Sequence, residues 1–130
     1  MGSARPILII EDDEAILSTL ELALGDEGYE VLTAMDGAAA LEVIERQAPA
    51  LILLDMKMPV MDGWTFAHAY RRQPEPWAPV LVVTAARDAA QRAAEVGADG
   101  YLAKPFELDD LLDLVGRYLD AEQLSPLPAS

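Results

Sequence analysis

The stretch Leu51-Ile-Leu-Leu-Asp55-Met-Lys-Met-Pro59 decides the fold of this chain. Its four consecutive aliphatic side chains predict a strand that is buried on both faces, as in a parallel sheet. Pro59 cannot continue a strand in the interior of a sheet, so the strand is expected to end near Asp55. Asp55 should therefore lie at the C-terminal edge of the sheet, where ligands bind in open α/β folds.

Three further apolar runs also end at polar residues. They are Ile7–Ile10 with Glu11, Asp12 and Asp13; Val80–Val83 with Thr84; and Gly100–Ala103 with Lys104. Because the C-terminal ends of parallel strands lie along one edge of a sheet, these side chains are expected to form one site with Asp55.

Between the apolar runs, hydrophobic residues recur at helical spacing, and Gly, Pro and Asp-Gly pairs mark the ends of segments. The expected helices are 14–24, 36–47, 64–71, 88–96 and 107–119, and another strand is expected at 29–34. This alternation of strand and helix predicts an α/β fold in which helices cover both faces of a five-stranded parallel sheet. We expect one domain over residues 6–121, an N-terminal extension or cloning remnant at 1–5, and a flexible tail or linker at 122–130.

Composition excludes several classes of function. The chain has 130 residues, enough for one domain with its own core, and 9 basic against 23 acidic residues give a net charge of −14. Binding to nucleic acid or to an anionic membrane is not expected of such a chain. The absence of cysteine excludes disulfides, thiolate metal sites and cysteine nucleophiles. We find neither a secretory signal nor a run of roughly 18 apolar residues, and we expect a cytoplasmic location.

The expected cluster of carboxylates suggests a metal ion and phosphoryl chemistry. Carboxylates that converge on one edge repel each other, and a divalent cation such as Mg²⁺ relieves that repulsion. An aspartate beside the cation can act as a nucleophile and form an acyl phosphate, whose oxygens Lys104 and Thr84 could then contact. Taken one by one, the same residues have simpler explanations. Glu11 and Asp12 could interact favourably with the dipole at the N-terminus of a helix, and Asp55 could be a turn residue. Thr84 could cap the following loop, and Lys104 could be a solvated surface lysine.

Four motifs together resemble the receiver domain of two-component response regulators, over residues from about Pro6 to Leu119. The motifs are Ile7-Leu-Ile-Ile-Glu-Asp-Asp13, Leu53-Leu-Asp-Met-Lys-Met-Pro-Val-Met-Asp-Gly63, Val82-Val-Thr-Ala85 and Gly97-Ala-Asp-Gly-Tyr-Leu-Ala-Lys-Pro-Phe106. The resemblance implies a flavodoxin-like fold with five parallel strands in the order 2-1-3-4-5.

The resemblance also assigns roles to single residues. Asp55 would be the phosphoacceptor, Thr84 the switch hydroxyl, Tyr101 the switch aromatic and Lys104 the phosphate-binding lysine, with a cis bond before Pro105. The expected Mg²⁺ ligands are Asp12, Asp55, Glu11 largely through water, and the backbone carbonyl of Lys57, with Asp13 as an alternative acid. Mn²⁺ could substitute for Mg²⁺.

The implied function is a phosphorylation-activated switch rather than a metabolic enzyme. A histidine kinase or a histidine phosphotransfer protein would phosphorylate Asp55, and the face made by the fourth helix, fifth strand and fifth helix would then act on a downstream protein. We expect a monomer or a weak, phosphorylation-dependent dimer. Gly100 and Leu114 stand where winged-helix regulators usually carry Asp and Arg, so the dimer of that subclass is not expected.

Three other classes of protein were weighed. A pseudo-receiver would keep the fold as a protein-interaction module without phosphotransfer, but the set of Asp12, Asp55, Thr84 and Lys104 is intact. A flavodoxin-like cofactor binder should have a phosphate loop after its first strand, where this chain has acids. A phosphohydrolase resembling the haloacid dehalogenases needs a second Asp two residues after the nucleophile, where this chain has Lys57.

Overall fold

The fold is a five-stranded parallel sheet covered by helices on both faces. The computed structural model describes residues 5–124, except for the side chains of Ala86 and of residues 120–124. The strands are β1 (Ile7–Ile10), β2 (Val31–Ala34), β3 (Leu51–Leu54), β4 (Val80–Ala85) and β5 (Gly100–Lys104). Their order in the sheet is β2-β1-β3-β4-β5, and every neighbouring pair is parallel, which confirms the predicted topology.

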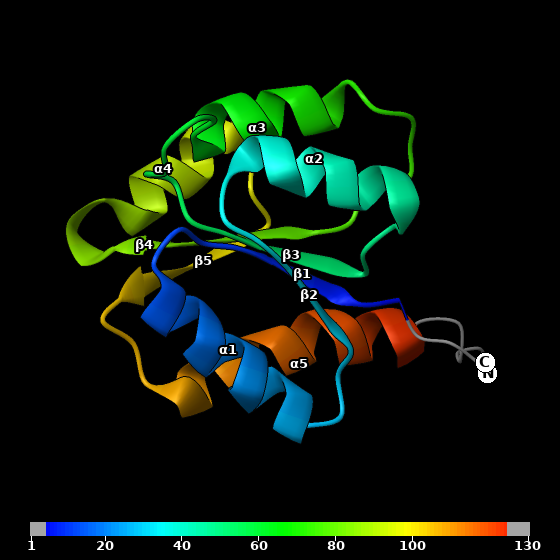
Figure 1. Cartoon of the computed structure of the whole chain (residues 1–130). Coiled ribbons are helices and arrows are strands. Elements are labelled where there is room, and N and C mark those ends of the chain that lie inside the picture. The colour runs from blue at the N-terminus through cyan, green and yellow to red at the C-terminus, as the bar shows by residue number, and fades with distance from the viewer. Residues whose placement is uncertain (1–4, 125–130) are drawn as a thin grey trace.

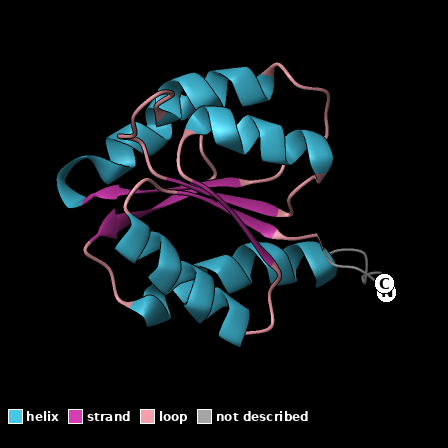
Figure 2. Cartoon of the chain, viewed as in Figure 1, coloured by secondary structure: helices cyan, strands magenta, loops and turns pink. Residues whose placement is uncertain are grey.

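The helices form two layers, one on each face of the sheet (Figures 1 and 2). One layer contains α1 (Glu14–Asp26) and α5 (Leu108–Leu124), and the other contains α2 (Gly37–Arg46), α3 (Gly63–Arg71) and α4 (Ala89–Val96). Each strand is followed by a helix that runs back across the sheet, and the C-terminal ends of the strands therefore meet at one end of the molecule.

The core explains why the central strands are apolar at every position. Ile7 and Ile9 pack into the core beneath α1 and α5, whereas Leu8 and Ile10, on the opposite face of the same strand, pack into the core beneath α2 and α3. All four β1 residues are at most 1% exposed. With helices on both faces of the sheet, every residue of β1 and β3 is buried.

The boundaries of several elements differ from those predicted. β4 continues through Thr84 to Ala85, and β5 continues to Lys104, because the two strands pair as far as Ala85 with Lys104. β2 begins at Val31, since the N–H of Tyr29 still donates to the carbonyl of Leu24 in α1.

Two helices also differ from prediction. A 3₁₀ turn (Ala86–Asp88) precedes α4, where the sequence had suggested one helix from Asp88. α5 continues to Leu124, beyond the expected end at Leu119, while residues 1–4 and 125–130 of the expected extension and tail lie outside the described residues. Over the described range, no helix combines the length and the apolar character that a membrane span requires.

Candidate phosphoacceptor and metal site

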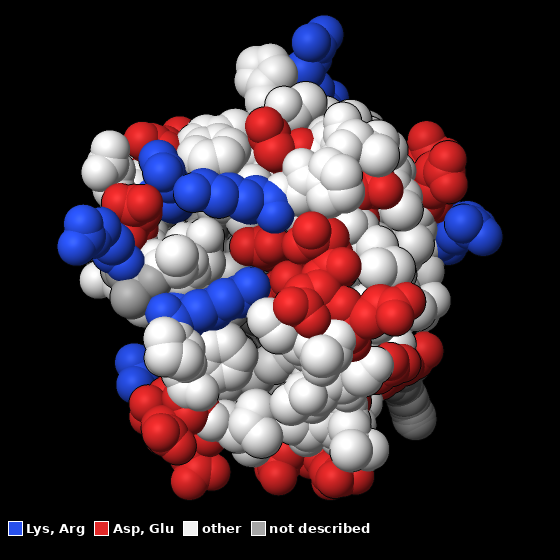
Figure 3. Space-filling view, turned by 60° about the vertical axis from the view of Figure 1, so that its left-hand side comes forward, with Lys and Arg blue, Asp and Glu red and all other residues white. Residues whose placement is uncertain are grey.

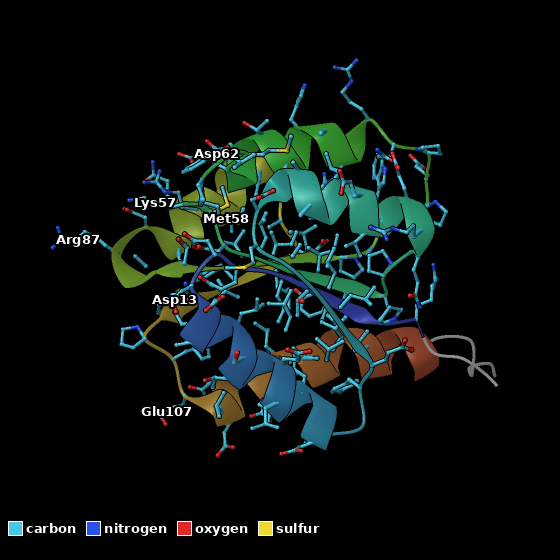
Figure 4. The ribbon with its side chains drawn as sticks, viewed as in Figure 1. Asp13, Lys57, Met58, Asp62, Arg87 and Glu107 are labelled. Carbon is cyan, nitrogen blue, oxygen red and sulfur yellow. The ribbon has the colours of Figure 1, made fainter. Side chains whose placement is uncertain are left out.

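Asp55 follows β3 directly and lies at the centre of the C-terminal end of the sheet. Its backbone N–H donates a hydrogen bond to the carbonyl of Ile10 at 3.0 Å, which extends the pairing of β3 with β1 by one residue. Only 7% of the residue is exposed. The loops that follow β1, β3, β4 and β5 surround this end of the molecule and carry the labelled residues of Figure 4.

Three carboxylates meet at this edge, as the sequence predicted. Glu11, Asp12 and Asp55 each offer one oxygen, and these oxygens all lie within 4.8 Å of one another. In the space-filling view, acidic side chains gather at the centre of this face, with basic side chains on two sides of them (Figure 3). A group of carboxylate oxygens at this spacing fits a hard divalent cation, because Mg²⁺ prefers oxygen ligands.

Lys104 brings a positive charge into the cluster from the end of β5. Its Nζ lies 2.8 Å from Glu11 Oε1, to which it donates a hydrogen bond, and 3.7 Å from Asp55 Oδ1. The bond between Lys104 and Pro105 is cis, as the resemblance implied, and so is the bond between Glu75 and Pro76, which was not predicted. The partly exposed lysine side chain thus contacts two buried carboxylates.

The surroundings of Asp55 raise the pKa of its carboxyl group. Burial is the largest cause and the negative charge of Glu11 the next; the ammonium of Lys104 opposes both, and the resulting pKa is about 6. Asp55 is therefore mostly ionised at neutral pH, and its negative charge is costly in this environment. A cation beside it would favour the ionised form.

Thr84 and Tyr101 lie on the neighbouring strands β4 and β5. Thr84 is 4% exposed and occupies the rung next to that of Lys104, since Thr84 pairs with Ala103 and Ala85 with Lys104. Tyr101, on the edge strand β5, is 49% exposed. The fold therefore brings Thr84 to the same edge as Asp55 and leaves the ring of Tyr101 accessible to solvent.

Asp13 has a structural role that the sequence left open. Its Oδ1 accepts hydrogen bonds from the N–H groups of Ala15 and Ile16, at 2.9 and 3.1 Å, so that Asp13 caps the N-terminus of α1. The group of three converging carboxylates does not include it. Lys57 lies on the loop after β3, where its side chain is exposed and projects from the same edge (Figure 4).

Sequence reasoning missed two glycines that contact the loop after β3. Gly37 and Gly63 each follow an aspartate that caps a helix, and the Asp-Gly pairs were interpreted only as the starts of those helices. In the structure their N–H groups donate to the carbonyls of Met61 and Met56. The only sequence signal for this contact was the repetition of Asp-Gly before two helices on the same face of the sheet.

Comparison with known proteins agrees with this geometry. The family model described as the response regulator receiver domain matches residues 7–116, which is most of the chain. The protein therefore belongs to the response regulator receiver domain family.

Related sequences and structures support the assignment. The transcriptional regulatory protein PrrA of Mycobacterium tuberculosis is 42% identical over 108 residues, which cover 82% of this chain but 46% of that protein. The probable transcriptional regulator ycf27 of Porphyridium aerugineum is 37% identical, with coverage of 81% and 44%. The chain thus spans less than half the length of these curated relatives.

Two solved structures are similar over nearly their whole length. The chemotaxis response regulator CheY4 of Vibrio cholerae has a TM-score of 0.81 and 34% identity, covering 89% of this chain and 99% of that one. The receiver domain of the sensor histidine kinase PA1611 from Pseudomonas aeruginosa has a TM-score of 0.82 and 30% identity, with coverage of 91% and 99%. That structure is described with a magnesium ion coordinated in its active site cleft.

Membership in this family establishes the general function. Receiver domains are signalling switches of two-component systems rather than true enzymes, they interact with histidine kinases, and they bind Mg²⁺ at an acidic pocket. The cluster of Glu11, Asp12 and Asp55 is an acidic group in this chain that fits such binding.

Proposed function

We propose that this chain is a phosphorylation-activated switch in which Asp55 accepts a phosphoryl group from a histidine kinase or a histidine phosphotransfer protein. The observation that carries the proposal is the placement of Asp55 beside the carboxylates of Glu11 and Asp12, with the Nζ of Lys104 3.7 Å from its Oδ1. This arrangement combines an ionisable nucleophile, a set of metal ligands and a cation for the phosphoryl oxygens.

The reaction follows from these charges. A carboxylate oxygen of Asp55 attacks the phosphorus of a phosphohistidine, the P–N bond breaks, and its electron pair remains on the imidazole nitrogen, which takes up a proton. Lys104 neutralises part of the charge on the transferring group. Asp12, Asp55, the carbonyl of Lys57 and, through water, Glu11 would hold Mg²⁺, which stabilises the negative charge on the phosphoryl oxygens. Attack of water on the acyl phosphate reverses the state of the switch.

The proposed switch acts through β4 and β5. The hydroxyl of Thr84 moves toward the phosphoryl oxygens, and the ring of Tyr101 turns inward into the space that Thr84 leaves. The face formed by α4, β5 and α5 then has a different shape for an unknown downstream protein. We propose that residues 6–121 form this unit, with a tail or linker at 122–130 whose first three residues still belong to α5, and that it works in the cytoplasm as a monomer or a weak, phosphorylation-dependent dimer.

A groove beside the site supports docking of a protein phosphodonor. The groove has a volume of about 600 Å³ and lies between α1 and the segment after β5, with Lys104 and Ala85 in its wall. Its other lining residues are mainly apolar: Ala15, Ile16, Thr19, Leu20, Pro105, Phe106 and Leu108. An apolar side chain of the donor that is seated here would lie next to the lysine that contacts Asp55.

The test is intact-mass analysis after incubation with acetyl phosphate, with and without Mg²⁺. We expect one added phosphoryl group in the wild type with Mg²⁺, and none with Asp55→Asn. The matched control Asp113→Asn, which changes an exposed aspartate on α5, should be phosphorylated like the wild type. An unmodified wild type that also fails to bind beryllofluoride, an acyl-phosphate mimic, would refute phosphotransfer and leave a protein-interaction module.

A further inference from the structure

The loop that follows Asp55, residues 56–62, accepts a backbone hydrogen bond near each of its two ends. Each donor is the first residue of a different helix. The N–H of Gly63, which begins α3, donates to the carbonyl of Met56 at 2.9 Å. The N–H of Gly37, which begins α2, donates to the carbonyl of Met61 at 3.0 Å. This loop also contains the backbone carbonyl of Lys57, one of the proposed metal ligands.

Neither glycine has room for a side chain. A Cβ on Gly63 would lie 2.8 Å from Met56 Cα and 3.0 Å from the carbonyl oxygen of Asp55. A Cβ on Gly37 would lie 2.8 Å from Met61 Cγ and 3.0 Å from the carbonyl oxygen of Met61. At Gly63 these contacts are with backbone atoms, which turning a side chain cannot relieve. At Gly37 the Met61 side chain can turn away, but the contact with the Met61 carbonyl oxygen remains, so the loop or the helix would have to shift by a few tenths of an ångström.

The start of α2 is anchored, so the loop is the part that would move. Asp36 Oδ1 accepts a hydrogen bond from the N–H of Ala39 at 2.8 Å and so caps the helix. Gly37 and Ala40 are buried, and Ala40 belongs to the core beneath α2. The loop, in contrast, is exposed at Lys57, Pro59 and Val60, the last of which is 85% accessible. Its three methionines, Met56, Met58 and Met61, contact the core beneath α2.

We propose that Gly37 is a positioning residue for the metal ion. Its close contact with Met61 holds one end of the loop, while Gly63 holds the other, in the conformation in which the carbonyl of Lys57 and the carboxylate of Asp55 can bind the same cation. This inference rests on the proposed function, because the position of the loop matters for binding only if Asp55 and Lys57 are ligands. It assigns a role in metal affinity to a residue that is not itself a ligand.

The test compares two glycine-to-alanine variants in helices. Gly37→Ala introduces the clash with Met61, whereas a Cβ on Gly25, in α1, would meet nothing within 4 Å. Alanine favours both helices over glycine, so the effect of helix propensity is common to the two variants. The Mg²⁺ dissociation constant is measured by calorimetric titration at constant ionic strength, and urea unfolding confirms that each variant is folded.

We expect Gly37→Ala to weaken Mg²⁺ binding by about 10-fold, the usual size of an effect on residues that orient metal ligands, and Gly25→Ala to leave it unchanged. If Gly37→Ala is folded and binds Mg²⁺ as tightly as the wild type, the positioning role of Gly37 is refuted. The proposed function stands in that case if acetyl phosphate phosphorylates the wild type. A wild type that binds no Mg²⁺ and accepts no phosphoryl group would overturn both proposals.

A second measurement needs no variant and decides the question if Gly37→Ala does not fold. If the contact between Gly37 and Met61 strengthens Mg²⁺ binding, then bound Mg²⁺ must stabilise that contact by the same free energy. Mg²⁺ should therefore slow hydrogen exchange of the Gly37 N–H several-fold more than that of the Ala40 N–H, which bonds within its own segment to the carbonyl of Asp36 at 3.1 Å. Equal slowing of the two amides would refute the role of Gly37.

Discussion

Ionised Asp55 lowers the stability of the domain in the absence of a cation. Its pKa of about 6 in the folded state exceeds the ordinary value of 3.8, so between these values the folded state binds more protons than the unfolded state. The free energy of unfolding therefore falls as the pH rises through this window, and above pH 6 the full cost is present. The residue that serves the proposed reaction therefore lowers the free energy of unfolding of the domain.

Replacing this carboxylate should stabilise the protein. Asp55→Asn is expected to raise the free energy of unfolding by about 1–3 kcal/mol at pH 7.5 without divalent cations, and the gain should shrink toward pH 4. Urea unfolding at the two pH values measures it. The exposed control Asp113→Asn should give little gain at either pH. Equal stability of Asp55→Asn and the wild type at pH 7.5 would contradict the cost assigned to burial.

Val60 is a second residue that lowers stability. Its φ of 65° places a β-branched side chain in the left-handed region, and 85% of the residue is exposed, so packing does not compensate for the strain. Val60→Asn should increase the free energy of unfolding by about 1 kcal/mol, because asparagine tolerates this conformation. Val60→Leu, which keeps an apolar side chain, should gain less. Thermal unfolding of the three proteins tests this, and a less stable Val60→Asn would refute the strain argument.

At the level of elements, α4 is joined to α3 by a group of polar contacts. Trp64 Nε1 donates to Glu95 Oε1 at 2.7 Å, and the guanidinium of Arg92 lies over the ring of Trp64, 5.0 Å from its centroid. Arg92 also pairs with Asp88 at 3.3 Å and with Glu95 at 3.5 Å. The helix is rich in alanine and its N-cap, Asp88, makes no side-chain capping bond. We infer that these contacts contribute strongly to the placement of α4.

Trp64→Phe removes the indole N–H but keeps an aromatic ring. We expect faster hydrogen exchange for the amides of α4, and a rise in the pKa of Glu95, which the hydrogen bond from Trp64 holds below its usual value. Trp77→Phe is the control, because the N–H of Trp77 donates to the carbonyl of Gln73 and not to α4. Exchange and carboxyl titration are followed by NMR. Unchanged exchange of α4 in Trp64→Phe would show that the tryptophan does not hold the helix.

The type and order of the elements could be predicted because each local signal agreed with the fold. The apolar runs, the helical spacing, the Asp-Gly starts of helices and the Gly and Pro stops all indicated one alternation of strands and helices. Boundaries failed where another segment decides them: the pairing of Ala85 with Lys104 lengthens β4, and the bond from Tyr29 to Leu24 delays β2. The partner strand of β4 lies outside its local sequence, and the Tyr29 bond depends on how the chain turns after α1.

The candidate site was predictable for a similar reason. Glu11, Asp12, Asp55 and Lys104 all follow or end strands, and parallel strands place such residues at one edge. The bond from Trp64 to Glu95 and the contacts of Gly37 and Gly63 depend on how helices and loops approach each other. Sequence spacing alone does not give those distances.

For the whole molecule, the net charge of −14 makes stability depend on ions in two separable ways. Added NaCl should raise the melting temperature by screening general repulsion among the acids. Mg²⁺ at matched ionic strength should add a specific increment, about 1.4 kcal/mol in the free energy of unfolding at a tenfold excess over its dissociation constant. Asp12→Asn should reduce the Mg²⁺ increment while keeping the NaCl effect. Equal effects of the two salts on the wild type would argue against a specific site.

The strand order β2-β1-β3-β4-β5 also bears on the synthesis of the protein. The candidate site is assembled from residues as far apart as Glu11 and Lys104, and Lys104 belongs to the last strand to be made. A nascent chain that has passed Asp55 but has not reached β5 holds the acids without their lysine and without one edge of the sheet. A ribosome-bound or truncated chain should therefore be unable to carry out the proposed phosphotransfer, which would require the complete domain.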